Sequence, residues 1–253
     1  MAKKKLFFAN WKMSLLPNQA VELAEAMVDK IKPRADQAIC LLPSFSALSL
    51  VQTVAGKSQL QLGAQDIFWQ EHGAYTGEES ALTLRELGCS SVLVGHSERR
   101  QYCHETDEMV NKKVKTCLEH GLQPIICVGE TFEERKDGQK DFIVMQQLEK
   151  ALSGVKLTKF DRLAVAYEPV WEIGSGQAAL PDEVWYTLQV LKQLLLNQYS
   201  PEVVRDQIWL LYGGSVDADN ILGLFGHPVL EGVLVGGSSL SVDNFNQLIQ
   251  ASS

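Results

Sequence analysis

The sequence lacks both an excess of basic residues and any apolar run long enough to cross a membrane. Its 31 Asp and Glu residues outnumber its 23 Lys and Arg residues, which gives a formal net charge of -8 at pH 7. Because nucleic-acid phosphates favour basic surfaces, this balance predicts no nucleic-acid partner. A membrane span needs about 20 apolar residues, so no membrane partner is expected either. A small phosphorylated substrate is compatible with an acidic chain, because such a ligand responds to the local charge of its site.

Cysteine is scarce, and the cysteines form no CxxC motif. The chain has 5, an odd number, and most lie in apolar or helical stretches. Buried free thiols are the simpler interpretation, so we expect a reducing, cytoplasmic setting. The N-terminal stretch MAKKKLFFANWK is basic but lacks the apolar segment of about 7–15 residues that a secretory signal needs. The cysteines are Cys40, Cys89, Cys103, Cys117 and Cys127.

The chain also lacks linkers, low-complexity tracts and charge blocks that would divide it. At 253 residues it is long enough to bury a sizeable core. Barrels of alternating strands and helices reach about 250 residues as one domain. We therefore expect residues 1–253 to form a single domain.

Short apolar runs recur along the whole sequence. Each is bounded by Gly, Pro or polar residues and is too short for a buried helix, which is typical of strands buried on both faces. The eight runs are LFFA (6–9), AICLL (38–42), LQLGA (60–64), SVLVG (91–95), PIICV (124–128), LAVAY (163–167), IWLLY (208–212) and GVLVG (232–236).

Amphipathic stretches between these runs predict helices over 17–31, 105–119, 131–152 and 181–199. Alternating strands and helices predict the α/β class with a parallel sheet. Eight such units in about 250 residues favour a closed barrel of eight parallel strands inside an outer ring of helices. An open doubly wound sheet would need a Gly-rich turn after its first strand, but Asn10-Trp11-Lys12 stands there.

Polar and Gly-rich residues follow five of the predicted strands. In a barrel, the carboxyl ends of the strands form one rim, where catalytic residues are found. We therefore expect these residues to meet at one site. They are Asn10 and Lys12 after the first strand, His96, Ser97 and Glu98 after the fourth, Glu168 after the sixth, Gly213-Gly214-Ser215 after the seventh and Gly236-Gly237-Ser238 after the eighth.

The two glycine pairs, Gly213-Gly214 and Gly236-Gly237, predict a phosphate site. Glycine lets a backbone approach a ligand closely, and a helix expected after each pair would present free N–H groups. One such pair alone is more often a tight turn. Two pairs after neighbouring strands favour the phosphate interpretation.

Glu168 is the candidate general base. A carboxylate at the end of an apolar strand can also be a solvated rim residue or an ion-pair partner. Here Pro169 fixes the backbone beyond it, and the short apolar segment 170–177 carries a Gly-rich tip that is typical of a mobile lid. A carboxylate beside a lid that excludes water is well placed to accept a proton.

His96 and Lys12 each have two interpretations. An isolated histidine is more often structural, and most lysines are solvated surface charges. At a helix N-terminus, however, the dipole disfavours a second ring proton, so a neutral His96 would donate a hydrogen bond to a substrate carbonyl. Within a phosphate-lined rim, Lys12 would attract an anion and stabilise negative charge on oxygen.

Seven segments together resemble the triosephosphate isomerase family, and their order and spacing match as well. The resemblance covers nearly the whole chain. It implies a (β/α)8 TIM barrel and an intramolecular aldose–ketose isomerase of glycolysis and gluconeogenesis, with a small phosphorylated triose as substrate and no metal or organic cofactor. The segments are Asn10-Trp11-Lys12, GAYTGE (73–78), GHSERR (95–100), CVGET (127–131), AYEPVWEIGSGQ (166–177), YGGSV (212–216) and LVGGSSL (234–240).

The resemblance also implies residue roles. Glu168 would move the proton between two substrate carbons, neutral His96 would polarise the carbonyl and Lys12 would stabilise the enediolate, which is the family's well-known arrangement. Asn10 would help to hold the substrate oxygens. The further implied residues are Ser97 as a resting partner of Glu168, Glu98 beside Lys12, Cys127 in a supporting position, Ile173 and Leu234 as an apolar clamp over Glu168, and the backbone N–H groups of Gly174, Ser215, Gly236 and Gly237 as phosphate ligands.

Two loops are implied as well. The excursion 65–80 would form a homodimer contact, with Thr76 entering a second subunit near Lys12 and His96, and Glu78 would brace the site through Arg99. The other loop is the lid, which comprises Pro169, Val170, Trp171, Glu172, Ile173, Gly174, Ser175, Gly176 and Gln177.

The chain departs from the family pattern at a few positions. Asp66 stands where the family usually has Asn, and Glu79 replaces an apolar residue, so either change would weaken the dimer. Glu172, Ser175 and Gln177 stand where the lid usually has Ala, Thr and Lys, and these changes would alter its closing. None of the departures removes a catalytic group.

Two rival interpretations remain. Another phosphate-binding barrel enzyme, such as a pentose-phosphate epimerase or an indole-forming synthase, explains the glycine pairs but not Asn-Trp-Lys, GHSERR and EPVW together. A non-catalytic barrel that binds a macromolecule is disfavoured by the surviving base, electrophile and lid.

Overall fold

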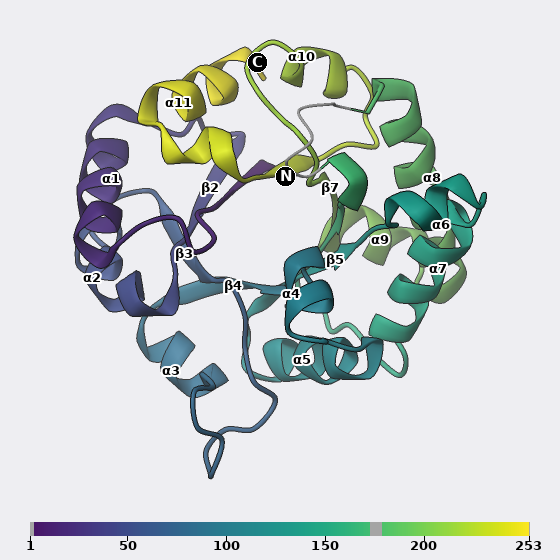
Figure 1. Ribbon diagram of the computed structural model, residues 1–253, viewed down its shortest axis with the longest axis horizontal. Helices are drawn as coiled ribbons and strands as arrows, with labels where there is room; N and C mark the ends of the chain where they lie inside the picture. Colours follow the sequence, from purple (N-terminus) through teal and green to yellow (C-terminus); the bar gives the residue numbers. More distant parts are fainter. Residues whose placement is uncertain (1–2, 173–178, 253) are drawn as a thin grey trace.

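The computed structural model describes residues 3–172 and 179–252 and shows a closed barrel of eight parallel strands inside a ring of helices (Figure 1). Each strand pairs with the next along the chain, and β1 closes the barrel by pairing with β8. The predicted α/β barrel is confirmed. The strands are β1 (Lys5–Asn10), β2 (Gln37–Leu42), β3 (Gln61–Ala64), β4 (Cys89–Val94), β5 (Gln123–Val128), β6 (Leu163–Tyr167), β7 (Ile208–Tyr212) and β8 (Gly232–Val235).

Helices cover the outside of the barrel. None of those in the described part of the chain is both long and apolar enough to cross a membrane. They are α1 (Pro17–Lys30), α2 (Phe45–Ala55), α3 (Ala81–Glu86), α4 (Ser97–Tyr102), α5 (Asp107–Glu119), α6 (Phe132–Lys136), α7 (Lys140–Ala151), α8 (Pro181–Gln198), α9 (Pro201–Gln207), α10 (Ile221–Leu224) and α11 (Val242–Ala251), with the 3-10 turns η1 (Val170–Glu172) and η2 (Gly237–Leu240).

The predicted helix over 131–152 is wrong as a single element. The structure divides it into α6 and α7, and Gly138 between them has a φ of +72°, a left-handed conformation that interrupts a helix. The helix expected over 105–119 begins slightly later, where the Thr106 hydroxyl accepts a hydrogen bond from the Met109 N–H and caps α5. The other two predicted helices are confirmed as α1 and α8.

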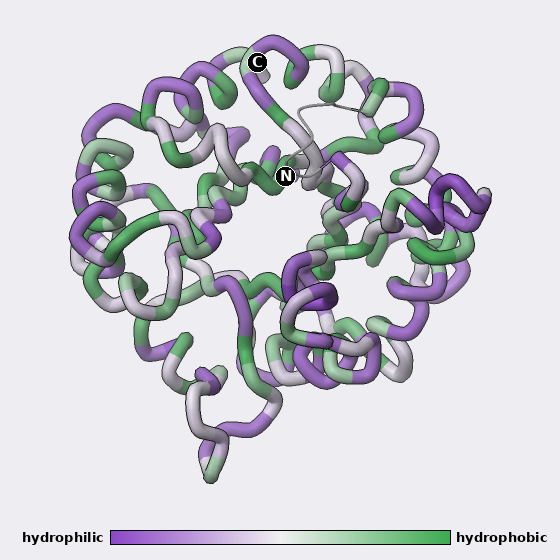
Figure 2. Tube along the Cα trace, in the orientation of Figure 1, coloured by the Kyte–Doolittle hydropathy of each residue, from purple (hydrophilic) through white to green (hydrophobic). Residues whose placement is uncertain are grey.

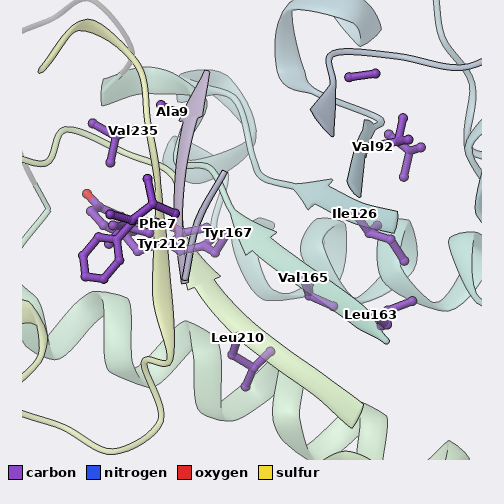
Figure 3. Packing of buried hydrophobic residues seen from close by; sticks show 14 of the residues in the cluster. Phe7, Ala9, Val92, Ile126, Leu163, Val165, Tyr167, Leu210, Tyr212 and Val235 are labelled. Carbon is purple, nitrogen blue, oxygen red and sulfur yellow. The ribbon is translucent and has the colours of Figure 1, made fainter. Parts of the chain in front are cut away.

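Strand side chains alternate between two apolar cores. On β1, Phe7 and Ala9 belong to the core between barrel and helices, whereas Leu6 and Phe8 belong to a second cluster inside the barrel. Figure 3 shows part of the outer core. Along the helices, hydrophilic and hydrophobic residues alternate (Figure 2), as expected for helices with one face on the barrel. Burial on both faces explains why the strands are continuous apolar runs.

All five cysteines are free thiols. Cys40, Cys89, Cys117 and Cys127 are buried, as the apolar sequence context predicts, and Cys103 is exposed. Cys127 lies on β5, next to the strand that ends at Glu168.

Three buried charged side chains and the partly exposed Arg99 form a cluster between the end of β3 and the helices α4 and α5. Asp66 contacts the Lys113 ammonium at 2.6 Å and the Arg99 guanidinium at 2.8 Å. Glu105 contacts Arg99 at 2.7 Å and Lys113 at 3.2 Å. Burial raises the pKa of Asp66 to about 6, against the attraction of Lys113. Asp66 is therefore paired within its own chain.

We expect Lys113→Met to lower the free energy of unfolding by about 3–5 kcal/mol, because it leaves two buried carboxylates with one cation between them. Urea unfolding at fixed protein concentration measures the change. Lys57→Met, at an exposed position after α2, is the control and should stay within about 0.5 kcal/mol of the wild type. Equal free energies of unfolding for the two variants would show that the cluster does not stabilise the fold.

Candidate active site

A pocket of about 570 Å³ opens at the carboxyl ends of the strands. The structure brings together side chains and backbone from β1, β4, β6, β7 and β8, as the expected rim requires. The lining residues include Asn10, Lys12, His96, Glu98, Glu168, Ser215, Leu234, Gly236 and Gly237, all candidates from the sequence, together with Glu172.

Glu168 is held at the end of β6 by its backbone and by its carboxylate. Its N–H donates to the Val128 carbonyl at 2.8 Å, which continues the ladder between β5 and β6. The carboxylate is buried and contacts His96 Nε2 through Oε1 at 3.1 Å. Its Oε2 accepts a hydrogen bond from the backbone N–H of Ser97 at 3.1 Å. Ser97 thus contacts the carboxylate through its main chain.

Two glycines make room for Glu168, of which sequence reasoning placed Gly213 in a phosphate site and missed Gly129 as a site residue. A Cβ at Gly129 would overlap the Glu168 carbonyl, and a Cβ at Gly213 would lie 2.9 Å from the Glu168 Cγ. Neither substitution fits without moving the base. Gly213 could be seen only as half of a glycine pair, and Gly129 only as part of the CVGET segment.

His96 forms the N-cap of α4 and has a defined tautomer. Its Nδ1 accepts the Glu98 N–H at 3.2 Å, so the ring proton belongs on Nε2. Nε2 faces the Glu168 carboxylate and lies 3.3 Å from the Asn10 amide nitrogen. The ring therefore presents an N–H to the pocket, as a carbonyl-polarising group requires.

The pKa values of this pair shift in opposite directions. Burial alone would lower the pKa of His96, but the adjacent Glu168 carboxylate outweighs burial and raises it. Burial alone would raise the pKa of Glu168, but His96 and the Ser97 N–H lower it below its ordinary value. The shift of His96 runs against the expectation from the helix dipole, because the carboxylate is in direct contact with the ring. The N–H donated to Nδ1 still opposes a second proton.

Lys12 is held in a backbone conformation that is rare for a residue with a side chain. Its φ is 52°, and its N–H donates to the Asn10 side-chain oxygen at 3.0 Å. The Gln65 amide donates to the Lys12 carbonyl at 2.8 Å and to the Leu42 carbonyl at 2.9 Å. The ammonium contacts Glu98 at 2.6 Å, which keeps its charge at the rim. Sequence reasoning missed Gln65 as a positioning residue, since a single amide after a strand carries no local signal.

The glycine pairs line the pocket, but the expected helices after them differ. After Gly213-Gly214-Ser215 the next helix, α10, begins only at Ile221, and after Gly236 the chain enters the short 3-10 turn η2. The expectation of a helix directly after each serine is therefore wrong. The Ser238 hydroxyl donates to the Val216 carbonyl at 2.8 Å and ties the two loops together.

The lid is described only at its first part. The Trp171 indole donates to Glu130 at 3.0 Å, and Glu172 is buried in the pocket wall. The predicted lid and phosphate residues Ile173, Gly174, Ser175, Gly176 and Gln177 lie outside the described residues.

The predicted dimer loop leaves the ring of helices between β3 and α3 (Figure 1). Thr76 and Glu78 are exposed on it. Within this chain, the Arg99 that Glu78 is expected to brace is paired with Asp66 and Glu105. Across 3–172 and 179–252, no group of three or more His, Cys, Asp or Glu residues is placed to hold a metal ion.

Comparison with known proteins gives one consistent result. A family model described as triosephosphate isomerase matches residues 5–252. A protein named triosephosphate isomerase from Thermoanaerobacter sp. (strain X514) is 40% identical over 247 residues, which cover 98% of this chain and 99% of the relative. A protein of the same name from Roseiflexus sp. (strain RS-1) is 41% identical over 96% of this chain and 96% of the relative. Another from Dictyoglomus turgidum (strain DSM 6724 / Z-1310) is 36% identical over 98% of this chain and 100% of the relative.

Proposed function

The chain belongs to the triosephosphate isomerase family and is an isomerase, and from that premise we propose that it interconverts D-glyceraldehyde 3-phosphate and dihydroxyacetone phosphate through an enediolate intermediate. The observation that carries this proposal is the meeting of Lys12, His96 and Glu168 around one pocket. These residues come from three strand ends that are far apart in the sequence.

Glu168 serves as the base in this proposal. It is buried, and its carboxylate is ionised because His96 and the Ser97 N–H oppose the effect of burial on its pKa. The substrate takes the place of the direct contact with His96, and one carboxylate oxygen then removes a proton from one substrate carbon. The same carboxyl group returns the proton to the adjacent carbon, while the hydroxyl proton passes from one substrate oxygen to the other by way of His96 Nε2, so no net proton is gained or lost.

His96 and Lys12 act on the oxygen atoms. The Nε2–H of His96 donates to the carbonyl oxygen, where negative charge develops as the proton leaves carbon. Lys12 supplies a positive charge from the end of β1, and the Asn10 side-chain oxygen holds the Lys12 backbone by accepting its N–H. Backbone N–H groups near Ser215, Gly236 and Gly237 bind the phosphate, with Gly174 of the lid closing over it. Ile173 and Leu234 exclude water from the base.

A coupled assay tests the proposal. The purified protein is incubated with D-glyceraldehyde 3-phosphate, and the dihydroxyacetone phosphate formed is reduced by an auxiliary dehydrogenase whose NADH consumption is recorded. We expect rapid conversion with no added metal and in the presence of a chelator. No product would reject the proposal and favour another phosphate-binding barrel enzyme.

We also propose that residues 1–253 form one domain, that the protein is a homodimer and that it works in the cytoplasm in glycolysis and gluconeogenesis. Pairing of the first strand with the last supports a single domain, because it closes one barrel from both ends of the described chain. Five free thiols support a reducing compartment. Exposed apolar side chains beside the pocket and on the projecting loop, Met13 at 94% and Tyr75 at 43% exposure, support a partner surface.

We expect Thr76→Arg to weaken the dimer at least tenfold, because a charged side chain at the tip of the loop must be buried in the partner subunit. Sedimentation velocity over a dilution series measures the dissociation constant. Lys57→Arg, at an exposed position outside this loop, is the control and should leave it unchanged. A dimer of unaltered affinity would place the subunit contact elsewhere.

A further inference from the structure

Glu172 enters the active-site pocket from η1, at a lid position where an uncharged alanine is usual in the resemblance described above. Only 1% of the residue is exposed. Its Oε2 accepts a hydrogen bond from the Tyr212 hydroxyl at 2.5 Å and lies 3.4 Å from the backbone nitrogen of Ser215, which donates to it. The backbone N–H of Ala179 bonds to the same side chain.

The surroundings of this carboxylate fit it closely. Tyr212 ends β7 and is buried, so its hydroxyl has a fixed position. A Cβ at Gly214 would collide with both the Tyr212 hydroxyl and the Glu172 Oε2. The glycine that opens the phosphate side of the pocket is therefore also the one that admits the carboxylate.

We propose that the carboxylate of Glu172 occupies the phosphate position at the Ser215 N–H in the substrate-free enzyme, and that the substrate's phosphate replaces it there. The inference rests on the proposed function, because it concerns the phosphate subsite of the same pocket. Carboxylate and phosphate oxygens accept the same N–H donors, so they cannot both hold this one.

Charge repulsion gives the competition a pH dependence. Burial raises the pKa of Glu172, against the hydrogen bonds from Tyr212 and Ser215. A bound phosphate dianion raises it further, because two anions in one pocket repel each other. Binding takes up a proton where Glu172 is ionised in the free enzyme and protonated in the complex, and the penalty on binding falls as the pH is lowered and free Glu172 becomes neutral. The charged and titratable groups around Glu172 are Tyr212 on β7, Tyr167 on β6, Glu130 after β5 with its partner Arg135, and across the pocket Lys12, His96, Glu98 and Glu168.

The test compares the wild type with Glu172→Gln, which keeps the shape of the side chain and removes its charge. Inorganic phosphate is the probe, measured as a competitive inhibitor and by calorimetry between pH 5 and pH 9. We expect Glu172→Gln to bind phosphate about 10-fold more tightly than the wild type at pH 9, with this ratio falling as the pH is lowered. Calorimetry in buffers of different ionisation enthalpy should show proton uptake that the variant lacks.

Two further variants complete the design. Glu172→Asp retains the charge and should retain the pH dependence, and Glu133→Gln, an exposed residue on α6, should behave as wild type. Equal phosphate affinity of wild type and Glu172→Gln at pH 9 would overturn the inference. If the wild type isomerises triose phosphates but binds phosphate as tightly as Glu172→Gln does, only the inference is rejected. If the wild type has no isomerase activity, the proposed function is rejected. Calorimetry measures phosphate binding in either case, because it does not depend on isomerase activity.

Discussion

Glu168→Asp is expected to lower kcat by about 100-fold or more while KM changes little. The substitution keeps the charge of the base but withdraws its oxygens by one methylene, which is about 1 Å or more from the substrate carbon. In the proposed site, the phosphate is bound by backbone groups of other loops, so we expect substrate binding to be retained. A loss confined to kcat is the signature of an interaction made in the transition state.

The expected result has a structural reason beyond chain length. The Glu168 backbone is fixed by the hydrogen bond to Val128 and by close contact with Gly129. The main chain therefore cannot move forward to compensate for a shorter side chain. Steady-state kinetics with D-glyceraldehyde 3-phosphate provide the measurement, and Glu149→Asp, exposed on α7, serves as the control. An unchanged kcat would remove Glu168 from the role of base.

The barrel could be predicted because each strand is short, apolar and buried on both faces. In LAVAY and IWLLY no polar residue interrupts the run, and the structure buries every residue of both. The candidate site followed from topology alone. Once the strands are parallel and closed, residues that follow strand ends must share one rim, which is why Asn10, His96 and Glu168 meet.

What could not be predicted depends on contacts between distant segments or on single backbone angles. Gly138 breaks an amphipathic stretch whose spacing continues through it, so helical periodicity gave no warning. Gln65 matters only because its amide reaches two carbonyls on other strand ends. Asp66 could be seen only as a departure from the usual residue, whereas its partner Lys113 lies 47 positions away and on another element.

His96→Gln is expected to lower kcat by about 10²–10³-fold, because the developing oxyanion loses its best-placed donor. The variant should also show a second effect that a purely structural histidine would not cause. In the wild type, burial favours the neutral form of Glu168, and the attraction of His96 more than offsets it, so the pKa of Glu168 is lowered. A glutamine does not place an N–H at the position of Nε2, and burial then acts with less opposition.

The sign of the pH effect follows from the role of the base. Glu168 works only when it is unprotonated, so a higher pKa means that activity is lost at a higher pH as the solution is acidified. The acid limb of the pH profile of kcat/KM should therefore lie at higher pH in His96→Gln than in the wild type. Both enzymes are measured with the same substrate, so that titration of the substrate's phosphate affects both profiles equally. His227→Gln, which changes a histidine paired with Gln189 on the outer helices, should leave both kcat and the limb in place. An acid limb that stays fixed in His96→Gln would mean that the contact between Nε2 and the carboxylate does not tune the base, and that the two residues act on the substrate independently.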